Sequence, residues 1–189
     1  MFAILQPELI HRIVESFPFS GEWQRLRCAD LRAPTTGKPD ARNWSPLTAT
    51  GSKGGVYAFL FPKCHFDQPR KIVLDGPGQS KIPFKFTAIA NLLTTDEQVV
   101  VYVGRAANLL QRFQWHFSLA ERNTGAQVQN GLVKCRLCPR RKQAVSFMLD
   151  HATIAFRILN GIEHAANRDI IEISLCAKFM SPFNIKSER

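Results

Sequence analysis

Two runs of β-branched and aromatic residues constrain the fold of this chain more than any other feature. The first covers residues 54–61 and the second residues 98–104, and both are rich in Val, Tyr and Phe, which favour strands. After Gly104, apolar residues recur at the spacing of an amphipathic helix: Ala106, Leu109, Leu110, Phe113, Phe117 and Ala120. The sequence therefore predicts two strands, of which the second leads directly into a helix.

The remaining periodicity predicts an α+β fold. A short helix is expected at residues 7–16, a third strand at residues 153–159, and a buried helix at about residues 166–179 that ends before Pro182. At 189 residues the chain is long enough for one good hydrophobic core. We expect a small central antiparallel sheet of about three strands, flanked by helices.

The chain divides into two parts. Residues 1–53 are interpreted as an N-terminal helix and a basic arm, whose tryptophans indicate an ordered segment because side chains of that size are usually buried. Residues 54–189 form the main domain, which contains a long insertion at about residues 62–97. Within it, the turn sequence at residues 75–78 separates two short apolar runs and predicts a protruding hairpin.

The chain is strongly basic. Lys and Arg outnumber Asp and Glu by 25 to 15, which gives a net charge of +10 and favours a polyanionic partner. A basic loop is expected before the third strand, with Lys134, Arg136, Arg140, Arg141 and Lys142. No apolar run reaches the roughly 18 residues of a membrane span, and the N-terminus lacks a secretion signal pattern. We therefore expect a cytoplasmic protein with no membrane partner.

The five cysteines are an odd number at scattered positions, which fits reduced thiols better than a disulfide framework. Cys135 and Cys138 have the two-residue spacing of a zinc knuckle, and Cys64 and His65 form the only other close pair of Cys and His residues. A structural zinc ion on these four residues is one interpretation. Ordinary reduced thiols are the expected one.

Polar side chains in two of the predicted helices suggest a site. Asn108, Arg112 and His116 are four residues apart and therefore line one stripe of the helix, where a guanidinium and an imidazole can grip a phosphate. A solvated helix face is the alternative. Glu172 stands in an apolar run, where a buried carboxylate needs a cation or hydrogen-bond donors. A structural salt bridge is the alternative for this residue.

Taken in order, these segments resemble the GIY-YIG nuclease family. Gly55-Val56-Tyr57 and Tyr102-Val103-Gly104 match its two signatures, each with Val in place of Ile. Asn108-Leu109, Arg112 and Glu172 match the family's Asn-Leu, arginine and metal-binding glutamate, and Pro182-Phe183-Asn184 matches its Pro-x-Asn. The resemblance covers roughly residue 50 to the C-terminus and is closest to the restriction endonucleases of the family. More than forty residues separate the two signatures here, where the family typically has a short turn.

The resemblance implies a role for each matched residue. Tyr57 is expected to act as general base and Tyr102 to position water or phosphate. Arg112 is expected to stabilise the negative charge that develops on the phosphate. Glu172 is expected to hold Mg²⁺ or Mn²⁺, and Asn184 to stabilise the arrangement of residues on the metal side of the site. Arg105 and the metal are expected to favour the phenolate of Tyr57, and His116 to hydrogen-bond the phosphate or Tyr57. The alternative for both tyrosines is simple packing within strands.

The implied function is a metal-dependent endonuclease that hydrolyses phosphodiester bonds of DNA, with duplex DNA as substrate and a role in restriction or defence. Two alternatives remain open: a DNA-repair nuclease, and a nucleic-acid-binding protein with a nuclease-like fold that does not cleave. Both a monomer and a homodimer are compatible with the sequence.

Overall fold

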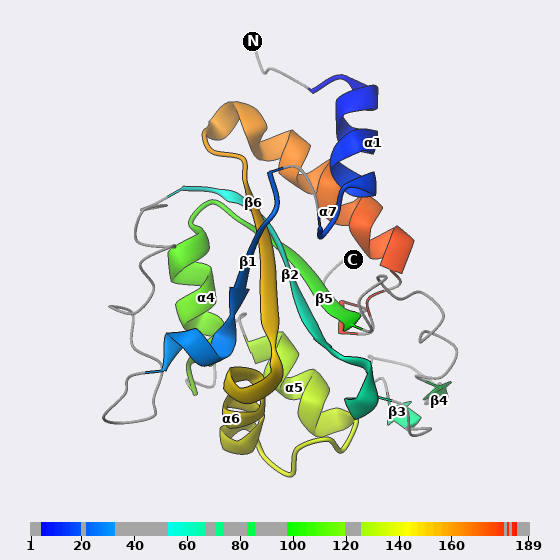
Figure 1. Ribbon diagram of the computed structural model, residues 1–189, viewed down its shortest axis with the longest axis vertical. Helices are drawn as coiled ribbons and strands as arrows, with labels where there is room; N and C mark the ends of the chain where they lie inside the picture. The colour runs from blue at the N-terminus through cyan, green and yellow to red at the C-terminus, as the bar shows by residue number, and fades with distance from the viewer. Residues whose placement is uncertain are drawn as a thin grey trace, which may run out of the picture.

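The computed structural model describes residues 5–19, 22–32, 53–66, 71–73, 83–85, 98–119, 126–179, 181, 183 and 184. Its centre is a four-stranded sheet of order β1-β6-β2-β5, in which all neighbouring strands are antiparallel (Figure 1). The strands are β1 (Gln24–Arg27), β6 (Thr153–Ile158), β2 (Gly55–Pro62) and β5 (Gln98–Ala106). The α+β class and the antiparallel sheet are confirmed.

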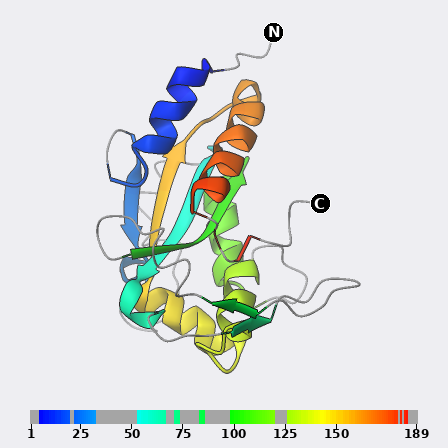
Figure 2. The same ribbon diagram turned by 90° about the vertical axis from the view of Figure 1, so that its right-hand side faces the viewer.

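Helices cover both faces of this sheet (Figures 1 and 2). One layer consists of α1 (Pro7–Glu15) and α7 (Ala165–Phe179). The other consists of α4 (Leu109–Phe117), α5 (Gln127–Lys134) and α6 (Arg141–His151). None of the helices in the described residues has the length and apolar character that a membrane crossing requires.

The two hydrophobic cores meet at β2, one of the two inner strands of the sheet. Val56, Ala58 and Leu60 pack into the layer of α1 and α7, whereas Tyr57, Phe59 and Phe61 pack into the layer of α4, α5 and α6. All six side chains are fully buried. This burial on both faces explains why the sequence of β2 is a continuous apolar run without alternation.

The strands expected at residues 54–61, 98–104 and 153–159 are confirmed as β2, β5 and β6, and the helices expected at residues 7–16 and 166–179 as α1 and α7. The sheet has one strand more than expected, because β1 from the N-terminal arm pairs with β6. In this edge strand only Leu26 is buried, so its sequence carries almost no hydrophobic signal.

The basic loop expected before the third strand is shorter than expected. Arg136 and Arg140 lie in the connection at residues 135–140, whereas Lys134 ends α5 and Arg141 and Lys142 begin α6, a helix that the sequence did not predict. The apolar residues of α6 that reach the core are Ala144, Met148 and Leu149, while its first turn is basic. The dense charge at the helix ends hid this weak periodicity.

The insertion carries a second, two-stranded sheet. β3 (Lys71–Val73) and β4 (Pro83–Lys85) pair antiparallel, with Ile72 opposite Phe84. The turn expected at residues 75–78 lies outside the described residues, as do residues 33–52 of the N-terminal arm.

The C-terminal segment closes the free edge of β5. The backbone N–H of Phe183 donates to the carbonyl of Val101 at 3.0 Å, and the side-chain amide of Asn184 pairs with both backbone groups of Val103. The Phe183 ring lies against Gly131 of α5, where an added Cβ would be 2.4 Å from the ring. The segment is therefore fixed to the strand and to the helix layer at once.

This contact makes Gly131→Ala a destabilising substitution. In a helix interior, alanine normally adds up to about 1 kcal/mol of stability over glycine. Here the new methyl group would displace the buried Phe183 ring, and we expect the free energy of unfolding to fall by about 1–3 kcal/mol in urea titrations. Asn130→Ala, at an exposed position of the same helix, is the matched control. Equal or greater stability of Gly131→Ala would contradict the docking of Phe183.

Candidate active site

The strand register brings the two signature segments together. Tyr57 of β2 lies opposite Gly104 of β5, and Phe59 lies opposite Tyr102. Both tyrosines therefore point to the face covered by α4, and their ring centroids are 6.0 Å apart. An added Cβ on Gly104 would be 2.7 Å from the Tyr57 hydroxyl oxygen and 2.8 Å from Cε1 of Tyr102. Glycine is required here because two aromatic rings occupy the space of its side chain.

α4 supplies the side chain that hydrogen-bonds to Tyr57. The Asn108 side chain caps this helix by accepting a hydrogen bond from the backbone N–H of Gln111 at 2.9 Å, which fixes where the helix begins. Two turns later, Nε2 of the fully buried His116 lies 2.7 Å from the Tyr57 hydroxyl. Of the two roles expected for His116, the structure therefore shows the contact with Tyr57.

Arg112 lies one turn before His116 on α4. Its guanidinium stacks over the ring of Trp115, 5.3 Å from the centroid. It is also the positive charge that acts on both tyrosines, because it lowers the pKa of Tyr57 and of Tyr102. The sequence analysis expected this influence from Arg105 and the metal. Among the described residues, Arg112 is the cation that lowers both pKa values.

Burial dominates the protonation of both phenols. Desolvation holds the pKa of Tyr57 well above its ordinary value and raises the pKa of Tyr102 to about 12. The carboxylate of Glu172 raises both pKa values further, so it lies within electrostatic reach of the tyrosines. At neutral pH the two side chains are neutral hydrogen-bonding groups.

Arg105 and Glu172 meet beside the edge strand. Arg105 Nε donates to Glu172 Oε2 at 2.8 Å, and its Nη1 lies 2.8 Å from Asp169 Oδ1. Glu172 is the least exposed of the three side chains, at 19%. Two carboxylates thus offset the charge of Arg105. Asp169 was missed in the sequence, although its position one turn before Glu172 on α7 was the available signal.

The Asn184 side chain hydrogen-bonds to the backbone of β5. Its Oδ1 accepts from the Val103 N–H at 2.8 Å and its Nδ2 donates to the Val103 carbonyl. Val103 stands between Tyr102 and Gly104, so this amide fixes the part of β5 that carries the site. Both amide groups are used in this way.

The carboxylates at this site suit a magnesium ion. Mg²⁺ is usually held by one or two carboxylates together with waters and substrate phosphates. Glu172 offers such a ligand within electrostatic reach of the tyrosines, and Asp169 lies one turn away on α7. Across the described residues, no three or more His, Cys, Asp or Glu side chains are grouped so as to hold a metal by themselves.

The four residues considered for zinc are not brought together. Cys135 and Cys138 are buried in the core, whereas Cys64 is exposed and His65 packs against Phe147 and His151. All five cysteines lie in the described residues and none forms a disulfide. The geometry therefore offers no support for a structural zinc ion.

Comparison with models of protein families, with curated protein sequences and with solved structures returns no match to this chain. The GIY-YIG resemblance therefore stays a prediction that depends on the residues themselves.

The chain contains two tyrosines, so its phenolate absorbance reports on this site alone. Ionisation should begin only above about pH 10, where free tyrosine titrates. Because the pKa of each phenol is higher in the folded than in the unfolded chain, its contribution to stability is complete below about pH 10. This contribution is lost as the pH rises through the folded-state pKa, which for Tyr102 is about 12.

The measurement is a spectrophotometric pH titration with circular dichroism as the control for folding. Arg112→Gln should delay ionisation to still higher pH, whereas Arg136→Gln, at an exposed position after α5, should not. Half-ionised tyrosines near pH 10 in a folded chain would contradict the buried arrangement.

Proposed function

We propose that this chain is a Mg²⁺-dependent DNA endonuclease of the GIY-YIG type. One observation carries the proposal: the two tyrosines of distant segments pack over Gly104, with His116 on Tyr57 and with Arg112 and Glu172 in electrostatic reach. Simple strand packing accounts for the burial of two tyrosines. It does not account for an imidazole bonded to one of them, or for a guanidinium and a carboxylate within electrostatic reach of both.

Phosphodiester hydrolysis needs an acceptor for the proton of the attacking water. In this proposal the Tyr57 oxygen takes that proton while its own phenolic proton passes to His116 through the 2.7 Å hydrogen bond. The raised pKa of Tyr57 disfavours a free phenolate, and transfer in one step to His116 avoids it. As the water oxygen bonds to phosphorus, the bond from phosphorus to the leaving sugar oxygen breaks, and this oxygen takes a proton from solvent. The phenolic proton ends on the imidazole, which is charged until it exchanges with solvent.

Negative charge on the phosphoryl oxygens is the second requirement. Arg112 already lowers the pKa of both phenols, so its charge acts at the place where the substrate anion would lie. Arg105 is about half exposed and can turn from its carboxylates to a phosphate. Glu172 would hold the metal ion, which when bound neutralises phosphate charge and lowers the pKa of bound water.

The proposed substrate is duplex DNA, cut in the cytoplasm in a restriction or defence role. The net charge of +10 favours a polyanion, and exposed basic side chains occur on β1 and around the junction of α5 and α6. They include Arg25, Arg27, Arg136, Arg140 and Lys142.

A second candidate function is nucleic-acid binding without cleavage. The complete burial of Tyr57 favours it, because a base with no solvent contact must be reached by its water through an opening of the site. The presence of Arg112 and Glu172 within electrostatic reach of Tyr57 argues for cleavage.

The test is incubation with supercoiled plasmid at low salt, with Mg²⁺ and with EDTA. We expect cleavage with Mg²⁺ only, and DNA binding that weakens steeply as salt rises. Glu172→Gln should abolish cleavage and retain binding. Glu15→Gln removes the same charge from an ion pair with Lys178 on α7 and should cut normally.

Each outcome separates the candidates. Salt-sensitive binding without cleavage in Mg²⁺ or Mn²⁺ would favour the second function. Normal cleavage by Glu172→Gln would remove this residue from the proposed site. A melting curve of the variant shows whether lost cleavage reflects lost folding.

A further inference from the structure

A small pocket lies between α1 and the sheet, at a part of the fold that the proposed function does not use. Its volume is about 200 Å³, and its lining residues are Leu9, Arg12, Ile13, Ser16, Glu22 and Arg157. A single water needs roughly 10–15 Å³ by this measure, so the pocket holds more than isolated solvent. It is smaller than the usual range for organic cofactors, roughly 300–1,000 Å³.

One of the residues that line the pocket is a buried arginine, Arg157. Arg157 lies in β6 opposite Val56 of β2, on the face covered by α1 and α7. Its neighbour on this face, Ala155, is fully buried, and Arg157 itself is only 8% exposed. A charged side chain at such a position is costly unless negative charge and hydrogen bonds compensate for the lost water.

That compensation is incomplete. One guanidinium nitrogen of Arg157, Nη2, forms an ion pair with the carboxylate of Glu22. The Glu22 side chain is 76% exposed, and pairs with so exposed a partner are weak. The buried Nε of Arg157 has no hydrogen-bond partner in the described structure. Burial lowers the pKa of Arg157 in spite of the nearby carboxylate.

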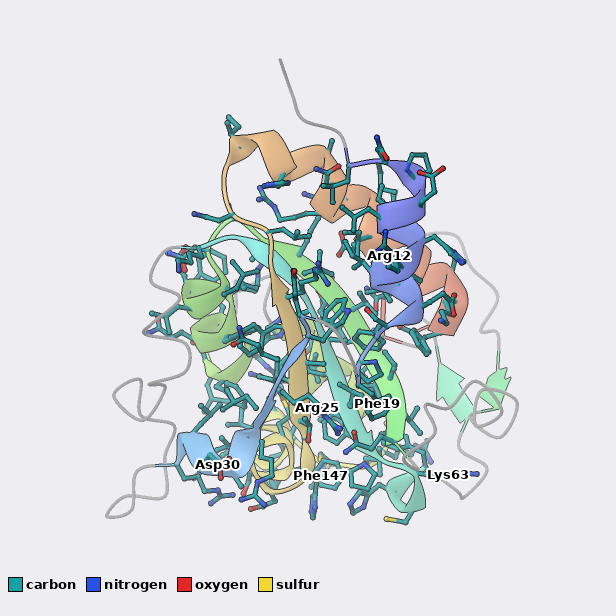
Figure 3. All side chains as sticks on the ribbon, turned by 45° about the horizontal axis from the view of Figure 1, so that its top comes forward. Arg12, Phe19, Arg25, Asp30, Lys63 and Phe147 are labelled. Atoms are coloured by element: carbon teal, nitrogen blue, oxygen red, sulfur yellow. The ribbon has the colours of Figure 1, made fainter. Side chains whose placement is uncertain are left out.

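A second guanidinium belongs to the same pocket. Arg12 is exposed on α1 (Figure 3) and lines the pocket together with Leu9, Ile13 and Ser16 of the same helix. Two arginines thus share a small pocket whose one acidic residue, Glu22, already contacts the buried one. The Glu22 carboxylate occupies the position in which an external anion would meet Arg157.

We propose that this pocket binds a phosphate group, which contacts Arg157 of β6 and Arg12 of α1. The phosphate takes the place of the Glu22 carboxylate on Arg157. Guanidinium groups bind phosphate oxygens through two parallel N–H donors, and the Nε of Arg157 supplies the donor that Glu22 leaves unused. The phosphate is either inorganic phosphate or the terminal phosphate of a nucleotide. The proposal holds whether or not the chain cleaves DNA.

The test is a titration with inorganic phosphate at constant ionic strength, followed through the Nε–H NMR signal of Arg157, which is assigned by its loss in Arg157→Gln. We expect a saturable shift of this signal. Glu22→Gln should tighten binding several-fold, because the internal competitor is removed at an exposed position. Arg12→Gln should weaken binding several-fold, and Arg157→Gln should abolish it in calorimetry.

Lys63→Gln, which removes the same charge just after β2 and outside the pocket, is the matched control and should bind phosphate like the parent chain. Should Arg157→Gln fail to fold, Arg12→Gln and Glu22→Gln carry the test by themselves. Absence of a saturable shift in both the parent chain and Glu22→Gln would overturn the proposal. Equal weakening by Arg12→Gln and Lys63→Gln would also overturn it, because it would indicate general screening.

A dinucleotide with and without a 5′-phosphate identifies the source of the group. Binding of the phosphorylated form at least as tightly as inorganic phosphate supports a terminal nucleotide phosphate. Binding of inorganic phosphate alone supports the free ion.

Discussion

The close approach of two tyrosine rings to Gly104 is the contact on which the rest of this site depends. With Tyr57 opposite Gly104 in the strand register, the space of a missing side chain is filled by Tyr57 and Tyr102. A Cβ at this position would lie within 2.8 Å of both rings and would force at least one of them to shift. One glycine thus joins two strands that are far apart in the sequence into one polar cluster inside an otherwise apolar core.

β5 can carry this cluster because its free edge is fixed. Phe183 and Asn184 bond to Val101 and Val103, and the Phe183 ring lies against Gly131 of α5. An edge strand without such cover exposes unpaired backbone groups and is free to shift. The C-terminal segment therefore holds Tyr102 on one side of the strand, while Arg105 on the other side reaches Asp169 and Glu172 of α7.

Much of the fold could be predicted from the sequence, because β2, β5 and β6 are buried and their apolar runs are long. β1 could not, since an edge strand with Leu26 as its one buried side chain has no hydrophobic pattern. For the site, the matched segments and the helix spacing predicted that Tyr57, Tyr102 and His116 belong to one group, and the structure brings these three side chains together. The pairing of Arg105 with carboxylates of α7 could not be predicted in full, because Asp169 meets Arg105 only in the folded chain.

In the proposed mechanism the Tyr57 oxygen, bonded to His116, is the base of a nuclease. Tyr57→Phe removes this one hydroxyl and keeps the ring over Gly104. In single-turnover cleavage of plasmid with Mg²⁺, we expect a rate about 10²–10⁴ times lower than that of the parent chain, with DNA binding nearly unchanged. The variant should fold with a lower melting temperature, because the buried His116 loses a hydrogen-bond partner at a cost of about 1–3 kcal/mol. Cleavage at the parental rate by a folded Tyr57→Phe variant would contradict this mechanism.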